Sequence, residues 1–110
     1  MAITIHIYYS GAQENAKKFA QEMTARGIVE ETRAEEGNLQ YEYFLPVERE
    51  DTVLLVDRWR DQKALEMHHA SPMMQKIISL REKYDLHMQV ERYISDDAGI
   101  LEQDRDFIRK

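Results

Sequence analysis

The sequence contains no cysteine, which excludes disulfides, thiolate metal sites, iron–sulfur clusters and cysteine nucleophiles. It has no long uncharged apolar run of the kind that spans a bilayer, and no basic stretch followed by an apolar segment near Met1. We therefore expect no membrane association and a cytoplasmic location. The 15 Lys and Arg residues are scattered among 21 Asp and Glu residues, for a net charge of -6. Without a basic face, nucleic acid is not an expected partner.

Motifs for nucleotide binding and serine hydrolysis are also absent. The chain has no G-x-G-x-x-G run, no P-loop and no nucleophile elbow. Its four histidines are His6, His68, His69 and His87. The one close pair is adjacent, whereas two imidazoles share a helical face when they lie four positions apart. We therefore expect no metal ion, and nucleotide binding and serine hydrolysis gain no support.

What the chain does have is a strong alternation of apolar and polar residues. With 110 residues, 43% of them hydrophobic, it is long enough for one core. Period-2 alternation predicts four strands. These are residues 3–9, 39–45, 52–59 and 87–94. In the second of them, Leu39, Tyr41 and Tyr43 are expected to share one face.

Helical periodicity fills the segments between these strands. A capping box of Ser10 and Gln13 predicts a first helix over about residues 11 to 26, ended by Gly27. The acidic residues 30–37 are interpreted as a connection with room for a short helical turn. Asp61 predicts the start of a second helix, and Ser71-Pro72 predicts a break and restart, because serine caps well and proline is tolerated at the first helical position.

The resulting order, β-α-β-β-α-β over residues 2–94, predicts an α+β fold of the ferredoxin-like, split β-α-β kind. In this fold both helices cover one face of a four-stranded antiparallel sheet. The other face would expose a large apolar patch, which predicts a homodimer joined sheet to sheet as a dimeric α+β barrel. The charged tail, residues 95–110, has helical spacing and is expected to pack on its own or the partner subunit, or to fray.

Three segments resemble one family. Residues 35–42 (EEGNLQYE), 53–59 (VLLVDRW) and 61–72 (DQKALEMHHASP) look like the central signature of the antibiotic biosynthesis monooxygenase family, which includes quinol monooxygenases. In that family a Glu-x-Gly segment opens the second strand, the third strand ends in Glu-x-Trp, and a helix carries a histidine before a serine. Here Asp57 replaces the usual Glu, Asn38 a frequent Cys, and Met73 a second histidine or other polar residue.

The resemblance implies a cofactor-independent oxygenase that uses O2 on a small quinol or polyphenol. Such a reaction needs a base that removes a phenolic proton in a dry pocket. Family correspondence assigns this role to His68, and histidine is the side chain whose usual pKa lies near neutrality. The alternative without a catalytic role is that His68 is a helix-surface or capping residue.

Three aromatic residues are candidate substrate contacts, each with a packing alternative. Trp59 is expected to present a flat ring to a planar ligand, although core tryptophans are commoner. Tyr41 and Tyr43 could donate hydrogen bonds to a quinol oxygen, or simply pack on the sheet. Alternative functions are a proton-transfer isomerase of the same fold, a heme-degrading oxygenase, and a non-catalytic dimer that binds small aromatic ligands. Heme degradation ranks below quinol oxidation because His6, Tyr8 and Tyr9 stand where heme-degrading relatives have asparagine.

Overall fold

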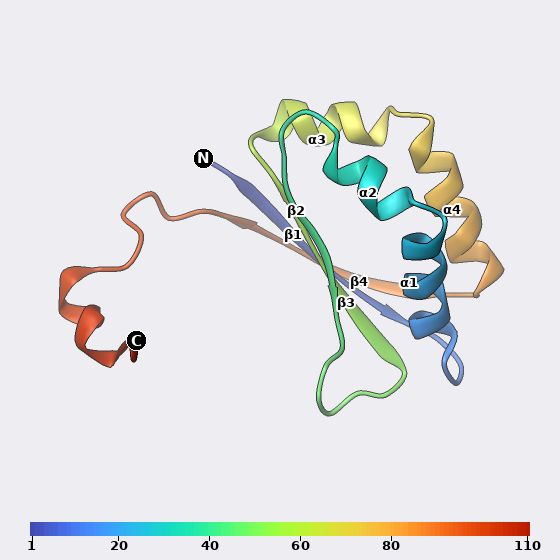
Figure 1. The fold of residues 1–110 in the computed structure, drawn as a ribbon, viewed down its shortest axis with the longest axis horizontal. Coiled ribbons are helices and arrows are strands. Elements are labelled where there is room, and N and C mark those ends of the chain that lie inside the picture. The colour runs from blue at the N-terminus through green and yellow to red at the C-terminus, as the bar shows by residue number, and fades with distance from the viewer.

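A computed structural model describes all 110 residues and has the predicted α+β, ferredoxin-like architecture (Figure 1). Its elements are β1 (Ile3–Ser10), α1 (Asn15–Ala25), α2 (Ile28–Arg33), β2 (Asn38–Phe44), β3 (Thr52–Trp59), α3 (Gln62–His69), α4 (Met73–Lys83), β4 (His87–Ile94) and the 3-10 helix η1 (Glu102–Phe107). All four predicted strands are confirmed, with ends that differ by one residue at most. No helix is both long and apolar enough to cross a membrane.

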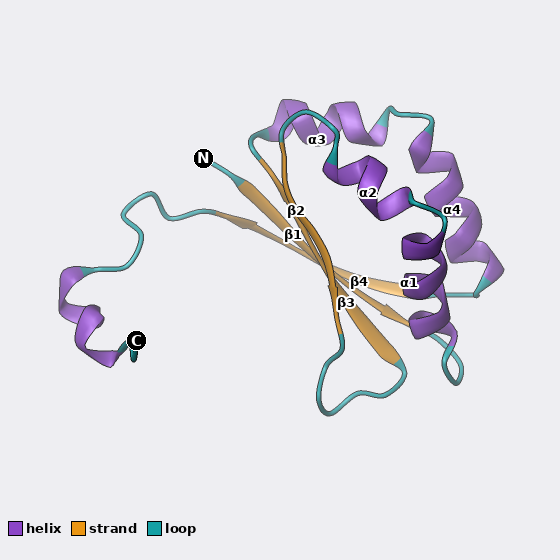
Figure 2. Cartoon of the chain, viewed as in Figure 1, coloured by secondary structure: helices purple, strands orange, loops and turns teal.

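The sheet has the strand order β2-β3-β1-β4, and every neighbouring pair is antiparallel. Helices α1 to α4 lie on one side of it and leave the other side uncovered (Figure 2). The helix-facing residues of β1 and β3 form the floor of the core. They are Ile3, Ile5, Ile7, Tyr9, Val53, Leu55, Asp57 and Trp59. Alternation along these strands thus separates a buried face from an open one.

Helix α1 starts later than predicted, because the expected capping box does not form. Ser10 is the last residue of β1 and pairs with Thr52 and His87, so it is not available as a cap. The helix begins at Asn15 without a side-chain cap. The side-chain Nδ2 of Asn15 instead donates to the Tyr84 carbonyl, which links the start of α1 to the end of α4. Gly27, with φ of 76°, ends α1 as predicted.

The segment interpreted as a connection contains a helix, α2. Ile28, Val29 and Thr32 are buried on its inner side, and the Thr32 hydroxyl donates to the Ile28 carbonyl. A segment of six residues is too short for helical periodicity to be recognised in the sequence. Packing of its three buried residues against the core stabilises the helix.

Helix α3 begins as predicted, since the Asp61 carboxylate accepts a hydrogen bond of 2.9 Å from the Ala64 amide. The restart at Ser71-Pro72 is also present, but Ser71 does not cap α4. Its hydroxyl donates to the His68 carbonyl at 2.7 Å, so it closes the end of α3 instead. The break between α3 and α4 follows His69, one residue after His68.

Strand β2 contains an irregularity that the sequence does not reveal. Asn38 pairs with Trp59 and Gln40 pairs with Arg58, so Leu39 is an extra residue at a β-bulge. Leu39 was expected inside with Tyr41, but it is 51% exposed. The bulge shifts the alternation by one residue, which is why Tyr41 faces the helices.

The C-terminal tail forms η1 and extends away from the body of the molecule (Figure 1). Every residue from 96 to 110 is exposed. The tail contains a 3-10 helix and makes no packed contact with its own subunit, and its packing on a partner subunit stays a prediction. Its apolar residues, among them Phe107, find too few neighbours along this extended path to be buried.

Candidate functional site

A cavity of about 290 Å³ lies between the helix-facing side of the sheet and helices α3 and α4. Most of its wall is apolar and comes from β1, β3, β4 and both helices. Its polar lining residues are Tyr41, Asp57, Gln62, His68, His69, Arg81 and Arg92. A small apolar cavity with a few convergent polar groups has the form of a ligand site.

His68 lies in the wall of this cavity, near the end of α3, and is only 4% exposed. Its Nδ1 atom lies 2.6 Å from Oε2 of Glu35, a half-buried residue in the turn between α2 and β2. The carboxylate accepts a hydrogen bond from a protonated Nδ1, so Nε2 is the nitrogen with a free lone pair. This is the arrangement by which a carboxylate orients a histidine base.

Trp59 stands behind His68 and not in the cavity wall. The two rings stack with centroids 4.8 Å apart and an interplanar angle of 28°. The indole is fully buried, and its Nε1 donates a hydrogen bond of 2.6 Å to Oδ1 of Asp57. Trp59 therefore contacts two polar side chains, His68 through its ring face and Asp57 through Nε1, and both of these line the cavity.

Asp57 is a buried carboxyl group whose protonation is displaced from the usual range. Burial raises its pKa to about 7, and the negative charge of Glu35 acts in the same direction. The hydrogen bond from Trp59 and the charge of Arg81 oppose the rise. A group that titrates near neutrality can give or take a proton, so the cavity contains two side chains suited to proton transfer.

Arg81 approaches the cavity from α4. Its Nε and Nη2 atoms donate to the Tyr9 hydroxyl at 3.1 and 2.9 Å, and no carboxylate lies within ion-pair distance. Burial raises the pKa of Tyr9, so its hydroxyl remains a neutral acceptor. The half-buried guanidinium thus lines the cavity while it is held by the Tyr9 hydroxyl.

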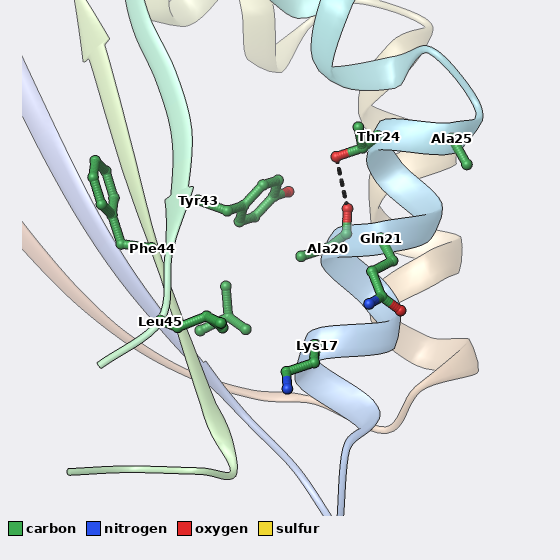
Figure 3. Close-up of a pocket in the computed structure, with 9 residues that line it drawn as sticks. Lys17, Ala20, Gln21, Thr24, Ala25, Tyr43, Phe44 and Leu45 are labelled. Atoms are coloured by element: carbon green, nitrogen blue, oxygen red, sulfur yellow. Dashed lines mark hydrogen bonds between the residues drawn. The ribbon is translucent and has the colours of Figure 1, made fainter. Parts of the chain in front are cut away.

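The two candidate tyrosines occupy different places. Tyr41 is buried and lines the cavity, with its ring centroid 6.4 Å from that of His68. Tyr43 points from β2 toward α1 into a separate, open groove of about 580 Å³ (Figure 3). Its hydroxyl oxygen is buried without a hydrogen-bond partner. Burial raises the pKa of both phenols.

The structure therefore brings His68, Trp59 and Tyr41 together and leaves Tyr43 outside. It adds Glu35, Asp57 and Arg81, which the sequence did not single out as site residues. Asp57 could have been found, because an acid at a buried position of a strand requires an explanation. Nothing in the sequence shows that Glu35 meets His68. No group of three or more His, Asp or Glu side chains is arranged to hold a metal ion.

The fold and the cavity define a ferredoxin-like α+β protein with a histidine–carboxylate pair at a small apolar cavity. Comparison with known proteins gives the family. The sequence model described as antibiotic biosynthesis monooxygenase matches residues 2–80, and the chain belongs to this family.

Individual relatives agree with this assignment. "Putative monooxygenase YcnE" of Bacillus subtilis (strain 168) is 31% identical over 77 residues, which cover 70% of this chain and 79% of that protein. A putative antibiotic biosynthesis monooxygenase from Deinococcus radiodurans superposes with a TM-score of 0.77 at 22% identity, over 92% of this chain and 98% of the other. SnoaB, a cofactor-independent oxygenase from Streptomyces nogalater, has a TM-score of 0.67 at 10% identity, over 87% and 94%. The two structural likenesses concern the fold.

Proposed function

We propose that this chain is a cofactor-independent monooxygenase that uses O2 on a small quinol or polyphenol. The observation that carries the proposal is the wall of the cavity, where Glu35 holds Nδ1 of the buried His68. Membership of the antibiotic biosynthesis monooxygenase family supports oxygenase chemistry. SnoaB, which has the same fold, is described as working without a cofactor.

The reaction we propose begins with proton transfer. Nε2 of His68 takes a proton from the bound phenol, and the electron-rich anion then reduces O2. No other reductant takes part, so the substrate supplies all four electrons that O2 accepts, two for the oxygen atom that joins the ring and two for the oxygen atom that becomes water. One oxygen atom joins a ring carbon, and the other leaves as water with two hydrogens of the substrate. Glu35 stabilises the imidazolium that forms, and the apolar wall excludes bulk water from the anion.

The remaining residues have supporting roles in this proposal. The Tyr41 ring forms part of the wall against which a planar substrate would lie. Trp59 acts through its stacking on His68 and its hydrogen bond to Asp57, which makes it a positioning residue. Tyr43 faces a different groove, so we assign it no contact with the substrate.

We also propose that the protein works as a homodimer. The uncovered side of the sheet presents Tyr8, Leu54, Val56 and Phe44 next to one another, because directly paired residues share a face. Exposed apolar surface on a sheet of this size favours association. A second copy packed on this face would bury these side chains and leave the helix-side cavity accessible.

Oxygen uptake tests the proposed activity. Wild-type protein, His68→Ala and Met67→Ala are compared on a panel of reduced naphthoquinols and anthrone-like phenols, with autoxidation subtracted. Met67 is the residue before His68 and is 57% exposed, which makes it a matched control. We expect saturable uptake that falls by about 100-fold in His68→Ala and is unchanged in Met67→Ala. Equal uptake by all three proteins would contradict a base at His68.

A proton-transfer isomerase is the second candidate, and Asp57 is the observation that favours it. A carboxyl group with a pKa of about 7 beside a histidine forms an acid and base pair in one cavity. Such a pair could move a proton between two carbons of a small dione without consuming oxygen. Isomerisation of diones without oxygen uptake, lost in both His68→Ala and Asp57→Asn, would identify this function. Binding of aromatic ligands without any turnover would instead indicate a ligand-binding dimer.

A further inference from the structure

The charges around the cavity are unbalanced, although the protein as a whole is acidic. Arg81 and Arg92 both line the cavity, and neither has a carboxylate within 4.0 Å. In contrast, Arg26, Arg33, Arg60 and Arg105 each form ion pairs on the surface. Asp57 is the one acidic residue that lines the cavity. The lining thus contains two guanidinium groups and one carboxyl group, while the Glu35 carboxylate next to it is hydrogen-bonded to His68.

Arg92 lies at the solvent-exposed edge of the cavity. It lies on β4, and its Nη2 donates to Oε1 of Gln62 at 2.7 Å, at the start of α3. This bond links strand and helix across the cavity wall. The partner is neutral, so the bond orients the guanidinium and leaves its charge and other N–H groups available. The Gln62 amide nitrogen adds a second donor beside it.

The sheet register places Arg92 at a definite distance from the proposed reaction centre. Ile5 of β1 pairs with Asp57 on one side and with Arg92 on the other. The three residues form one row on the helix-facing side of the sheet, so Asp57 and Arg92 are separated by two strand spacings, roughly 10 Å. This separation is between backbones, and the Ile5 side chain forms the floor between the two residues. An extended two-ring aromatic body with a polar group at each end can span it above Ile5, with Met88 and Val90 of β4 as further apolar lining.

We infer that the cavity selects phenolic substrates that carry a carboxylate, which Arg92 and Gln62 bind while the hydroxyl group lies at His68 and Asp57. This inference rests on the proposed function, since it names the substrate class of the same site. Arg92 is then a specificity-determining residue. Its planar guanidinium suits a carboxylate, which can accept two parallel hydrogen bonds from it.

Binding of two oxygen-stable probes tests the inference without depending on turnover. The probes are 2-naphthol and 6-hydroxy-2-naphthoate, which share the ring system and the hydroxyl group and differ by the carboxylate. Isothermal titration calorimetry with the full chain is expected to show the carboxylate probe binding about tenfold more tightly to wild type. In Arg92→Met the preference should fall to about threefold or less, while the affinity for 2-naphthol stays within about twofold. Arg92→Lys should retain part of the preference for the carboxylate probe, because lysine keeps the positive charge.

Two further variants make the result specific. Arg26→Met removes a surface arginine at the end of α1 and should leave the preference unchanged. Arg81→Met leaves the Arg92–Gln62 bond in place and should retain most of it. Equal binding of the two probes to wild type, or a preference that survives in Arg92→Met, would overturn the inference while leaving His68-dependent oxygen uptake intact. Failure of both probes to bind would also overturn it, and the oxygen-uptake assay would then decide separately on the proposed function.

Discussion

Glu35 and His68 are separated by 33 positions in the chain, yet their side chains meet at 2.6 Å. The contact joins the turn before β2 to the end of α3. Each of these segments is fixed from elsewhere: Gly37 accepts a backbone hydrogen bond from Arg60, and Ser71 closes α3. The pair is therefore held by the fold itself, and the histidine does not need a ligand to be oriented.

Glu35→Gln should lower turnover without removing the histidine. Glutamine can still accept a hydrogen bond from Nδ1, but it cannot stabilise the imidazolium by charge. We expect kcat for oxygen uptake to fall by about 10- to 100-fold. Glu36→Gln is the matched control, because Glu36 is the next residue, is exposed, and contacts Arg60 at 3.8 Å. If the two variants have the same kcat, Glu35 does not position the base.

Asp57→Asn should change how stability depends on pH. Burial raises the folded-state pKa to about 7 from the ordinary 3.8, so the folded protein binds the proton more tightly than the unfolded chain. Stability contributed by protonated Asp57 is then present below pH 4 and is lost as the pH rises to about 7. The loss amounts to roughly 4 kcal/mol at most.

The asparagine side chain of the Asp57→Asn variant can still accept the hydrogen bond from Trp59 but does not titrate. Urea unfolding between pH 4 and 8 should therefore show a shallower decline of the free energy of unfolding in Asp57→Asn than in wild type. Parallel pH profiles for the two proteins would show that Asp57 ionises normally.

Gly37→Ala should destabilise the protein more than Gly27→Ala. Both glycines have positive φ, 85° and 76°, so each substitution introduces backbone strain of about 1 kcal/mol. A Cβ at Gly37 would lie 2.5 Å from Cβ of Ala64, whereas a Cβ at Gly27 meets nothing within 4 Å. We expect an additional cost of about 1–3 kcal/mol at Gly37 from this overlap.

Chemical denaturation of the two alanine variants measures the difference directly. Ala64→Gly added to Gly37→Ala should recover part of the loss, since it removes the opposing atom. Equal stabilities for Gly37→Ala and Gly27→Ala would show that the turn moves freely away from α3.

Tyr43→Phe and Tyr9→Phe should have opposite effects on stability. The Tyr43 hydroxyl is buried without a partner, so its removal should raise the free energy of unfolding by about 1 kcal/mol. The Tyr9 hydroxyl accepts two hydrogen bonds from Arg81, and its removal should lower that free energy by about 1.5–3 kcal/mol. Urea titration of both variants provides the measurement. A destabilised Tyr43→Phe protein would mean that this hydroxyl has a partner in solution.

Leu54→Asp should shift the protein toward monomers. Leu54 lies on the uncovered side of the sheet, opposite Tyr8 on one neighbouring strand and Phe44 on the other. A charge at this position would have to be desolvated in a sheet-to-sheet dimer. Analytical ultracentrifugation at micromolar concentration should give wild type twice the 13.1 kDa mass of one chain and Leu54→Asp close to that mass. A monomeric wild type would contradict the proposed dimer.

The parts of the structure that follow local rules were predictable from the sequence. Alternation located the four strands, and Asp61 located the start of α3, because such signals involve neighbouring residues only. The family resemblance singled out His68, which the structure buries on α3. In contrast, Ser10 satisfies the pattern of a helix cap but forms the end of β1, where it pairs with residues of both neighbouring strands. Tertiary pairing decided that case.

The rest of the site depends on contacts between distant segments. Glu35 lies in an acidic stretch whose composition gives no reason to prefer it over Glu36. Arg81 follows the pattern of an ordinary basic residue near the end of a helix, and its approach to Tyr9 spans 72 positions. Tyr41 and Tyr43 are equivalent in the sequence, and only the placement of α1 separates them into different cavities. These distinctions require the packed arrangement.

The bulge at Leu39 also sets how β2 tolerates deletions. Removal of Leu39 would make Asn38 and Gln40 consecutive, and each already pairs with consecutive residues of β3, so the ladder would close without any change of register. Removal of Glu42, only three positions further on, would turn Phe44 to the side where Tyr43 now lies, because side chains alternate along a strand. Within this short strand, deletion of Leu39 therefore leaves the core-facing residues in place. Deletion of Glu42 exchanges the core-facing and solvent-facing residues at the end of the strand.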